Sequence, residues 1–425
     1  MNLFHLISIL IVFAATFGYL NERFLKLPAI IGLFLISMAF SLLVLLLGNV
    51  FPSLLSYEKS ILNQIDFQNF LMKGILGLML FAGALRLDLE QMKTQRIPIF
   101  IFATLGVLIS TFIIGIALFN ILGLMGISVP LIHTLIFGAL ISPTDPIAIL
   151  GILNKTSIAK SLEIKIEGES LFNDGVGYVL FVTLCHIATQ KIGDAQLSFF
   201  PIALLFLKEV GGALILGYLL GKLTTHALSK INNYEVEVLL TLALVMGGYM
   251  LADILRVSGP IAMVVGGLMI GKGLTKGKGL SDITKDYVRK FWELIDALLN
   301  AILFLLLGLT VLQVQFNKEI FIIGIFCILL VLLSRFISLK VLTLTMKNWI
   351  FFEPGASFIM TWGGLRGGIS IAMAIILSQE ISKDLFLSIT YIIVVFSILV
   401  QGLTLEKVVK KFDANVEKET KRKIK

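Results

Sequence analysis

The sequence "SPTDP" at residues 142–146 interrupts an apolar segment that is otherwise long enough to cross a membrane. Its two prolines remove two backbone donors and disrupt the helical hydrogen bonds on either side of Asp145. A second interruption, "TWGGLRGGIS" at residues 361–370, places four glycines around Arg366. Simple kinks would also explain prolines and glycines, but each interruption carries a charge. Irregular backbone at membrane depth is tolerated only inside protein or along a cavity, so the pair predicts a buried polar site.

The composition around these interruptions is that of a polytopic membrane protein. The chain has 425 residues, of which 57% are hydrophobic and 15% charged, and its mean hydropathy is +0.98. This balance excludes a soluble globular protein. We expect an all-α fold of about thirteen membrane-spanning helices. The apolar segments are 3–20, 28–48, 69–85, 97–122, 131–153, 168–189, 202–228, 235–255, 259–272, 292–313, 319–345, 355–378 and 385–403.

The basic residues predict how these helices are oriented. With the N-terminus outside and the helices alternating, 26 Lys and Arg fall on the inner side and 5 on the outer side. Such a bias indicates an outside N-terminus and a cytoplasmic C-terminus. We therefore expect an integral protein of the plasma membrane, the inner membrane of a bacterium. The net charge of +8 is mostly this topological signal, so a nucleic-acid partner is not needed to explain it.

The two interruptions occupy corresponding positions in two halves of the chain. If the seventh segment is a linker, the interrupted segments are each the fifth of six. We therefore expect one transmembrane domain over 1–403, with two inverted repeats at about 1–190 and 235–403. The linker helix would cover about 200–228, and a short basic cytoplasmic tail would occupy 404–425.

The charges near the interruptions divide into paired and unpaired groups. A broken helix exposes two new ends, so Asp145 could neutralise helix N-termini and Arg366 helix C-termini. A step of about 100° per residue separates Glu169 from Asp174 by about 140° around the sixth helix. Glu169 should therefore look toward a different neighbour, and Arg335 is the best available partner.

Asp174 is left as a single uncompensated carboxylate. A lone buried carboxylate must take up a proton or a cation, so the two would compete for one site. Ser170 lies on the same helical face, and oxygen ligands from Asp174, Ser170 and Thr144 suit a hard ion such as Na⁺. Asn173 adds no second titrating charge, which predicts electroneutral exchange of one Na⁺ for one H⁺.

At these residues the sequence resembles the monovalent cation:proton antiporter-1 family, the sodium/proton exchangers of the NhaP and NHE type. The resemblance implies thirteen helices, crossed interrupted helices, a homodimer and 1:1 exchange associated with Asn173-Asp174. It also implies an ion site at Asp174, Asp145, Thr144 and Ser170, a structural ion pair Glu169–Arg335, and Arg366 steadying the interruptions. The matching motifs are "SPTDPIAIL" (142–150), "EGESLFNDGVGYVLF" (167–181), "SGPIAMVVGGLMIG" (258–271), "FWELIDALLNAILFLLLGL" (291–309), "SRF" (334–336) and "WGGLRGGISIAMA" (362–374).

Other functions remain open at the level of the sequence. Relatives that move K⁺ or Li⁺ share these motifs, so K⁺/H⁺ exchange is the main alternative. A cation channel is disfavoured because one carboxylate and one arginine do not form rings along a continuous pore. A membrane sensor is disfavoured because no sizeable soluble domain is evident. We expect no enzymatic activity and no cofactor; the expected partners are Na⁺, H⁺, the lipid bilayer and a second copy of the chain.

Overall fold

The computed structural model describes residues 3–47, 74–87, 89–145, 160–189, 199–276, 281–314, 317–353 and 355–411. Every regular element in these ranges is a helix, and the β pairing within them is one isolated bridge. The helices are α1 (Leu3–Leu20), α2 (Ala29–Leu47), α4 (Gly77–Arg86), α5 (Leu89–Ile101), α6 (Val107–Leu124), α7 (Leu131–Ile141), α9 (Lys160–Thr189), α10 (Phe199–Leu228), α11 (Tyr234–Leu255), α12 (Gly259–Lys276), α13 (Asp282–Leu309), α14 (Lys318–Met346), α15 (Ala356–Gly363), α16 (Gly368–Ile375) and α17 (Lys383–Phe396).

The predicted all-helical membrane protein is confirmed at this level. Among the described residues, eight helical stretches are long and apolar enough to cross a membrane. Three shorter apolar helices accompany them, at Gly74–Arg86, Leu131–Ile141 and Gly259–Thr275. Each of the thirteen predicted apolar segments overlaps at least one described helix. The count of thirteen spans and the two inverted repeats nevertheless stay predictions, because several of these helices are too short to span a membrane alone.

Several helices extend beyond their apolar segments. Helix α9 begins at Lys160 and α13 at Asp282, well before the predicted starts at 168 and 292. The start of α13 is capped by Ser281, whose hydroxyl accepts a hydrogen bond from the Thr284 amide at 3.1 Å. Hydropathy locates only the apolar part of a helix, so capped polar extensions are missed.

The last helical stretch also runs further than expected. It covers Lys383–Lys411 and so includes the start of the segment predicted as a tail from 404. Leu405 and Val409 are fully buried there, in a cluster that also contains Phe102 and Leu162. Their burial explains why the helix continues. The remainder of the predicted tail lies outside the described residues.

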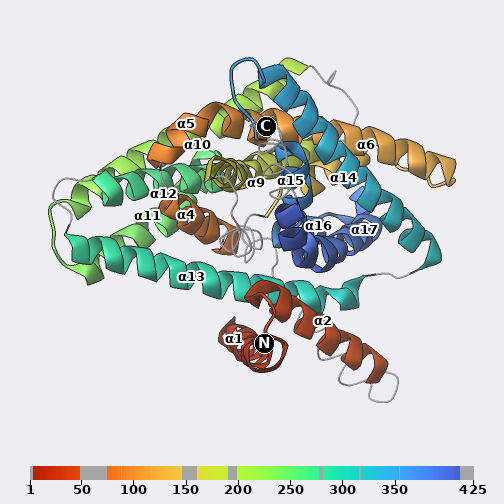
Figure 1. Ribbon diagram of the computed structural model, residues 1–425, viewed down its shortest axis with the longest axis horizontal. Coiled ribbons are helices and arrows are strands. Elements are labelled where there is room, and N and C mark those ends of the chain that lie inside the picture. Colours follow the sequence, from red (N-terminus) through yellow and green to blue (C-terminus); the bar gives the residue numbers. More distant parts are fainter. Residues whose placement is uncertain are drawn as a thin grey trace, which may run out of the picture.

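The helices form two groups that meet at the interrupted segments (Figure 1). In one group α12 packs against both α10 and α4, and α13 packs against α2 and α4. In the other group α14 packs against α6, α15 and α17, while α7 packs against α6 and α9. Contacts of α9 with α10, α12 and α4, and of α16 with α13, join the groups.

Close packing of α12 on α4 depends on small residues. A Cβ added at Gly267 would lie 2.6 Å from the carbonyl oxygen of Phe81, and one at Gly271 would lie 2.6 Å from that of Leu85. Glycines four residues apart therefore let the two backbones approach, a common solution in membrane helices. This packing fixes the position of α4 beside α9.

The two interrupted segments meet at non-helical backbone. Helix α7 ends at Ile141, and the Ser142 amide makes the last helical hydrogen bond, to the Gly138 carbonyl oxygen at 3.1 Å. Residues 143–145 then leave the helix. The second interruption separates α15 from α16 at residues 364–367. The Asp145 amide donates to the Leu365 carbonyl oxygen at 2.8 Å, in an antiparallel bridge. The rest of the fifth predicted segment, 146–153, lies outside the described residues.

Candidate cation and proton site

Arg366 lies at the C-terminal end of α7 and contacts the carbonyl groups of the two residues that follow this helix. Its Nη1 donates to the carbonyl oxygen of Pro143 at 2.9 Å and also to that of Ser142. The side chain is buried, and its backbone amide donates to the Ser397 hydroxyl at 2.8 Å. The positive charge thus lies just beyond the partially negative C-terminal end of α7.

Asp145 lies against the start of α16. A Cβ added at Gly367 would overlap the Asp145 carboxylate and would lie 2.8 Å from the Asp145 Cβ. Gly368 then begins the helix. Only glycine at 367 leaves room for this carboxylate, which is therefore close to the partially positive end of α16.

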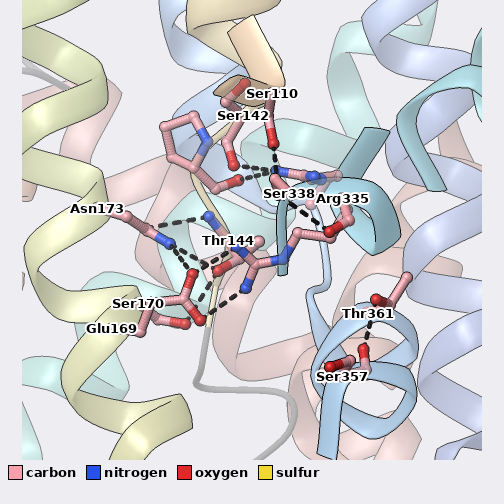
Figure 2. A network of polar contacts seen from close by, with 12 residues as sticks. Ser110, Ser142, Thr144, Glu169, Ser170, Asn173, Arg335, Ser338, Ser357 and Thr361 are labelled. Carbon is pink, nitrogen blue, oxygen red and sulfur yellow. Dashed lines mark hydrogen bonds and ion pairs between the residues drawn. The ribbon is translucent and has the colours of Figure 1, made fainter. Parts of the chain in front are cut away.

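Glu169 and Arg335 form a buried ion pair across α9 and α14 (Figure 2). Arg335 Nη2 donates to Glu169 Oε2 at 2.7 Å, and Nη1 donates to Oε1, so the contact is bidentate. Both side chains are almost fully excluded from solvent. This geometry is the strongest form of a carboxylate–guanidinium contact.

Asn173 joins the interrupted chain to α9, as Figure 2 shows. Its Nδ2 donates to the Thr144 hydroxyl at 2.9 Å, and its Oδ1 accepts from the Thr144 amide at 3.2 Å. The same Nδ2 lies 3.4 Å from Glu169 Oε1. The Thr144 and Ser170 hydroxyls are 3.0 Å apart. Asn173 thus orients Thr144, a role that the sequence interpretation missed because the partner lies on another segment.

Asp174 differs from these neighbours because it has no hydrogen-bond or ion-pair partner in the part of the chain that the structure describes. It is only 5% exposed, and within the described ranges no hydrogen bond or ion pair reaches its carboxylate. It lies on α9 one turn from Ser170. An ionised carboxylate in such a position is unfavourable unless a proton or a cation neutralises it.

A cavity of about 50 Å³ connects Asp174 with Asp145 between the two helix groups. A single water needs roughly 10–15 Å³ measured in this way, so the cavity can hold an ion with a few waters. The lining residues come from α4, α9, α13 and the interrupted segments: Leu76, Met79, Leu80, Gly83, Arg86, Leu87, Asp145, Glu167, Leu171, Asp174, Asp296, Leu303 and Ile369.

Three charged residues of this cavity were not predicted as part of the site. Arg86 Nη2 and Asp296 Oδ2 form an ion pair at 2.8 Å, and Asn300 Nδ2 donates to Asp296 Oδ1 at 3.0 Å. Glu167 lines the cavity seven residues before Asp174. The seven-residue spacing places both carboxylates on one helical face and was a usable signal. The contact of Arg86 with Asp296 joins two segments that are far apart in the chain, so no signal in the sequence could have revealed it.

The fold and the site together define the class of protein. Crossed, interrupted helices beside a buried unpaired carboxylate, in an all-helical membrane protein, are typical of secondary active ion transporters. The particular family follows from comparison with known proteins.

The family model described as "Sodium/hydrogen exchanger, transmembrane" matches residues 10–411. The Na(+)/H(+) antiporter NhaP of Pseudomonas aeruginosa is 42% identical over 96% of this chain and 97% of its own length. The Na(+)/H(+) antiporter NhaH of Halobacillus dabanensis is 32% identical over 95% of this chain and 97% of its own length. The chain therefore belongs to the sodium/hydrogen exchanger family.

A solved structure shows the same fold. The sodium proton antiporter MjNhaP1 from Methanocaldococcus jannaschii superposes with a TM-score of 0.74 at 19% identity. The alignment covers 97% of this chain and 99% of that one. The helical architecture described above is thus close to the fold of MjNhaP1.

Proposed function

We propose that this protein exchanges Na⁺ for H⁺ across the membrane and that both ions compete for Asp174. One observation carries this proposal: Asp174 is buried and has no partner among the described residues, whereas Glu169, Arg335 and Arg366 are all bonded. The membership of the family and the names of the two relatives support the choice of ions.

The cation would be held by oxygen atoms around the cavity. Asp174 supplies the charge, and Asp145 lines the same cavity. The hydroxyls of Ser170 and Thr144 lie 3.0 Å apart outside the lining of this cavity, so they would have to turn toward it to bind the cation. Carboxylate and hydroxyl oxygens are suitable ligands for a hard monovalent cation. Asn173 is neutral, so one carboxylate exchanges one proton for one Na⁺ and the cycle moves no net charge.

Movement would follow from the two groups of helices. We infer that one group of helices, α7, α9 and α14–α17, moves against the other group, α1, α2, α4 and α10–α13. This movement would open the cavity first to one side of the membrane and then to the other. Only a neutralised Asp174 would make this transition, because an unpaired charge in a closed, low-dielectric cavity is disfavoured. We further propose a homodimer in the plasma membrane, with the N-terminus outside and the C-terminus in the cytoplasm.

Transport by purified protein in liposomes tests the proposal. Asp174→Asn should reduce Na⁺-driven dissipation of a pH gradient to the background of empty liposomes. The matched control is Asp282→Asn, because the Asp282 side chain is 98% exposed at the start of α13. The control should transport like the wild type. Native transport by Asp174→Asn would show that this carboxylate is not the exchange site.

The same assay discriminates the alternatives. Na⁺, Li⁺ and K⁺ should be added side by side, and the proposal predicts saturable signals with Na⁺ or Li⁺. A larger signal with K⁺ would favour K⁺/H⁺ exchange. Flux that rises linearly far above millimolar Na⁺ would instead indicate a channel.

A further inference from the structure

A large groove lies outside the ion cavity, between the end of α14 and the start of α15. Its volume is about 520 Å³, ten times that of the cavity at Asp174. The walls are formed by the last three turns of α14, residues between Lys347 and Glu353, Gly355 and the first residues of α15. We call this feature the α14–α15 groove.

The polar side of the groove is positively charged. Lys340 and Lys347 line it, both are exposed, and neither has an ion-pair partner in the described part of the chain. Lys340 is on α14 and Lys347, seven residues later, is its C-cap with helical backbone angles, so the two lie on one face about 10 Å apart. The carboxylate among the lining residues, Glu353, forms an ion pair with the buried Lys165 at 3.0 Å. Both lysine charges thus remain available to a ligand.

The start of α15 adds a second element that attracts anions. Gly355, with φ of +79°, turns the chain into the helix, and the first residues of α15 line the groove. The hydroxyls of Thr343 and Ser357 meet at 3.2 Å between the two helices. A helix N-terminus with nearby lysines and hydroxyls is a favourable environment for a phosphate group.

The other side of the groove is apolar and open. Leu344 is 50% exposed, Phe358 40% and Phe351 79%. Further along α14, Leu333 and Val341 are also about half exposed. On a helix of a membrane protein this surface faces acyl chains, so a hydrocarbon chain could leave the groove along α14.

We propose that the α14–α15 groove binds the headgroup of an anionic phospholipid. The phosphate would lie between Lys340, Lys347 and the start of α15, while the acyl chains would follow the apolar face of α14. Both lysines fall on the side that the distribution of basic residues assigns to the cytoplasm, where anionic lipids attract juxtamembrane lysines. Binding would restrain α15, the first half of the interrupted helix that precedes Arg366. The binding itself does not depend on the proposed transport reaction.

Thermal unfolding of the detergent-purified full chain tests this site. Phosphatidylglycerol should raise the unfolding midpoint by several degrees more than phosphatidylcholine with the same acyl chains. The double variant Lys340→Gln/Lys347→Gln should lose this difference and bind phosphatidylglycerol roughly 30-fold more weakly, since two lysine–headgroup interactions are lost. Lys340→Arg/Lys347→Arg should retain it.

The matched control removes two other exposed lysines, Lys222 and Lys230 at the end of α10. Lys222→Gln/Lys230→Gln should keep the full response to phosphatidylglycerol. If both double variants lost the response to phosphatidylglycerol equally, diffuse surface charge would explain the binding and the proposed site would be wrong. Equal stabilisation of the wild type by the two lipids would overturn it as well. If inorganic phosphate reproduced the shift, the groove would be a phosphate site and the lipid assignment would be wrong.

Discussion

Individual side chains of this site have separate tasks. Arg366 compensates carbonyl groups of the residues that follow α7, and Glu169 and Arg335 compensate each other. Asp174 is buried without such a partner among the described residues, and we propose that it serves the ions. The helical step alone separated Glu169 from Asp174 and led to the expected pairing with Arg335. It could not reveal that Asn173 bonds Thr144, because that contact joins segments 29 residues apart. Periodicity reports faces of one helix and says nothing of what packs on them.

The buried ion pair gives a prediction for stability. Glu169→Ala leaves Arg335 as an unpaired buried charge and should cost about 3–5 kcal/mol of unfolding free energy. The double variant Glu169→Ala/Arg335→Ala should be less destabilised than the sum of the single changes, because it leaves no orphaned charge. Thermal or denaturant unfolding of the four proteins in one detergent measures this cycle. Additive effects would show that the two side chains do not stabilise each other.

At the scale of elements, apolar runs located the helices and proline and glycine located the interruptions. The apolar runs predict α9, α13 and the last helix shorter than they are, since caps and tertiary packing extend these helices into polar sequence. The antiparallel bridge between Asp145 and Leu365 could not be foreseen, because nothing local fixes its register. The first interrupted segment also lies very close to α9, because a Cβ added at Gly177 of α9 would overlap the ring of Pro143.

This close approach gives a second prediction. Gly177→Ala should push α9 away from the interrupted segment, destabilise the protein by about 1–3 kcal/mol and reduce transport. Gly247→Ala is the matched control, because Gly247 also lies within a helix but has nothing within 4 Å of its added Cβ. The control should be neutral or slightly stabilising, by up to about 1 kcal/mol. If both variants had the same unfolding midpoint and the same transport rate, the packing at Pro143 would not be tight.

The described helices form two groups, and the cavity that Asp174 lines lies between them. The sequence indicated the membrane class, the two interruptions and the family, whereas the partition into groups depends on packing. That partition explains why Arg86 and Asp296, from one group, face Glu167 and Asp174 from the other. A cavity between two bodies can change its opening when they shift, whereas a site within one body cannot.

Electroneutral exchange gives a prediction at this scale. If one H⁺ is exchanged for one Na⁺, an imposed membrane potential should leave the initial transport rate of the wild type unchanged. Liposomes with valinomycin and defined K⁺ gradients provide potentials of either sign. A rate that rises with one sign of the potential and falls with the other would show that net charge moves.

The central claim is that Na⁺ and H⁺ compete for Asp174, and proton release on Na⁺ binding tests it most directly. Na⁺ is added to the purified protein in weak buffer, and released protons are counted with a pH dye or by calorimetry in buffers of different ionisation enthalpy. The wild type should release about one proton for each Na⁺ bound, since the carboxylate must lose its proton to bind the ion. Asp174→Asn should neither bind Na⁺ nor release a proton. Undiminished Na⁺ binding with proton release in this variant would contradict the account.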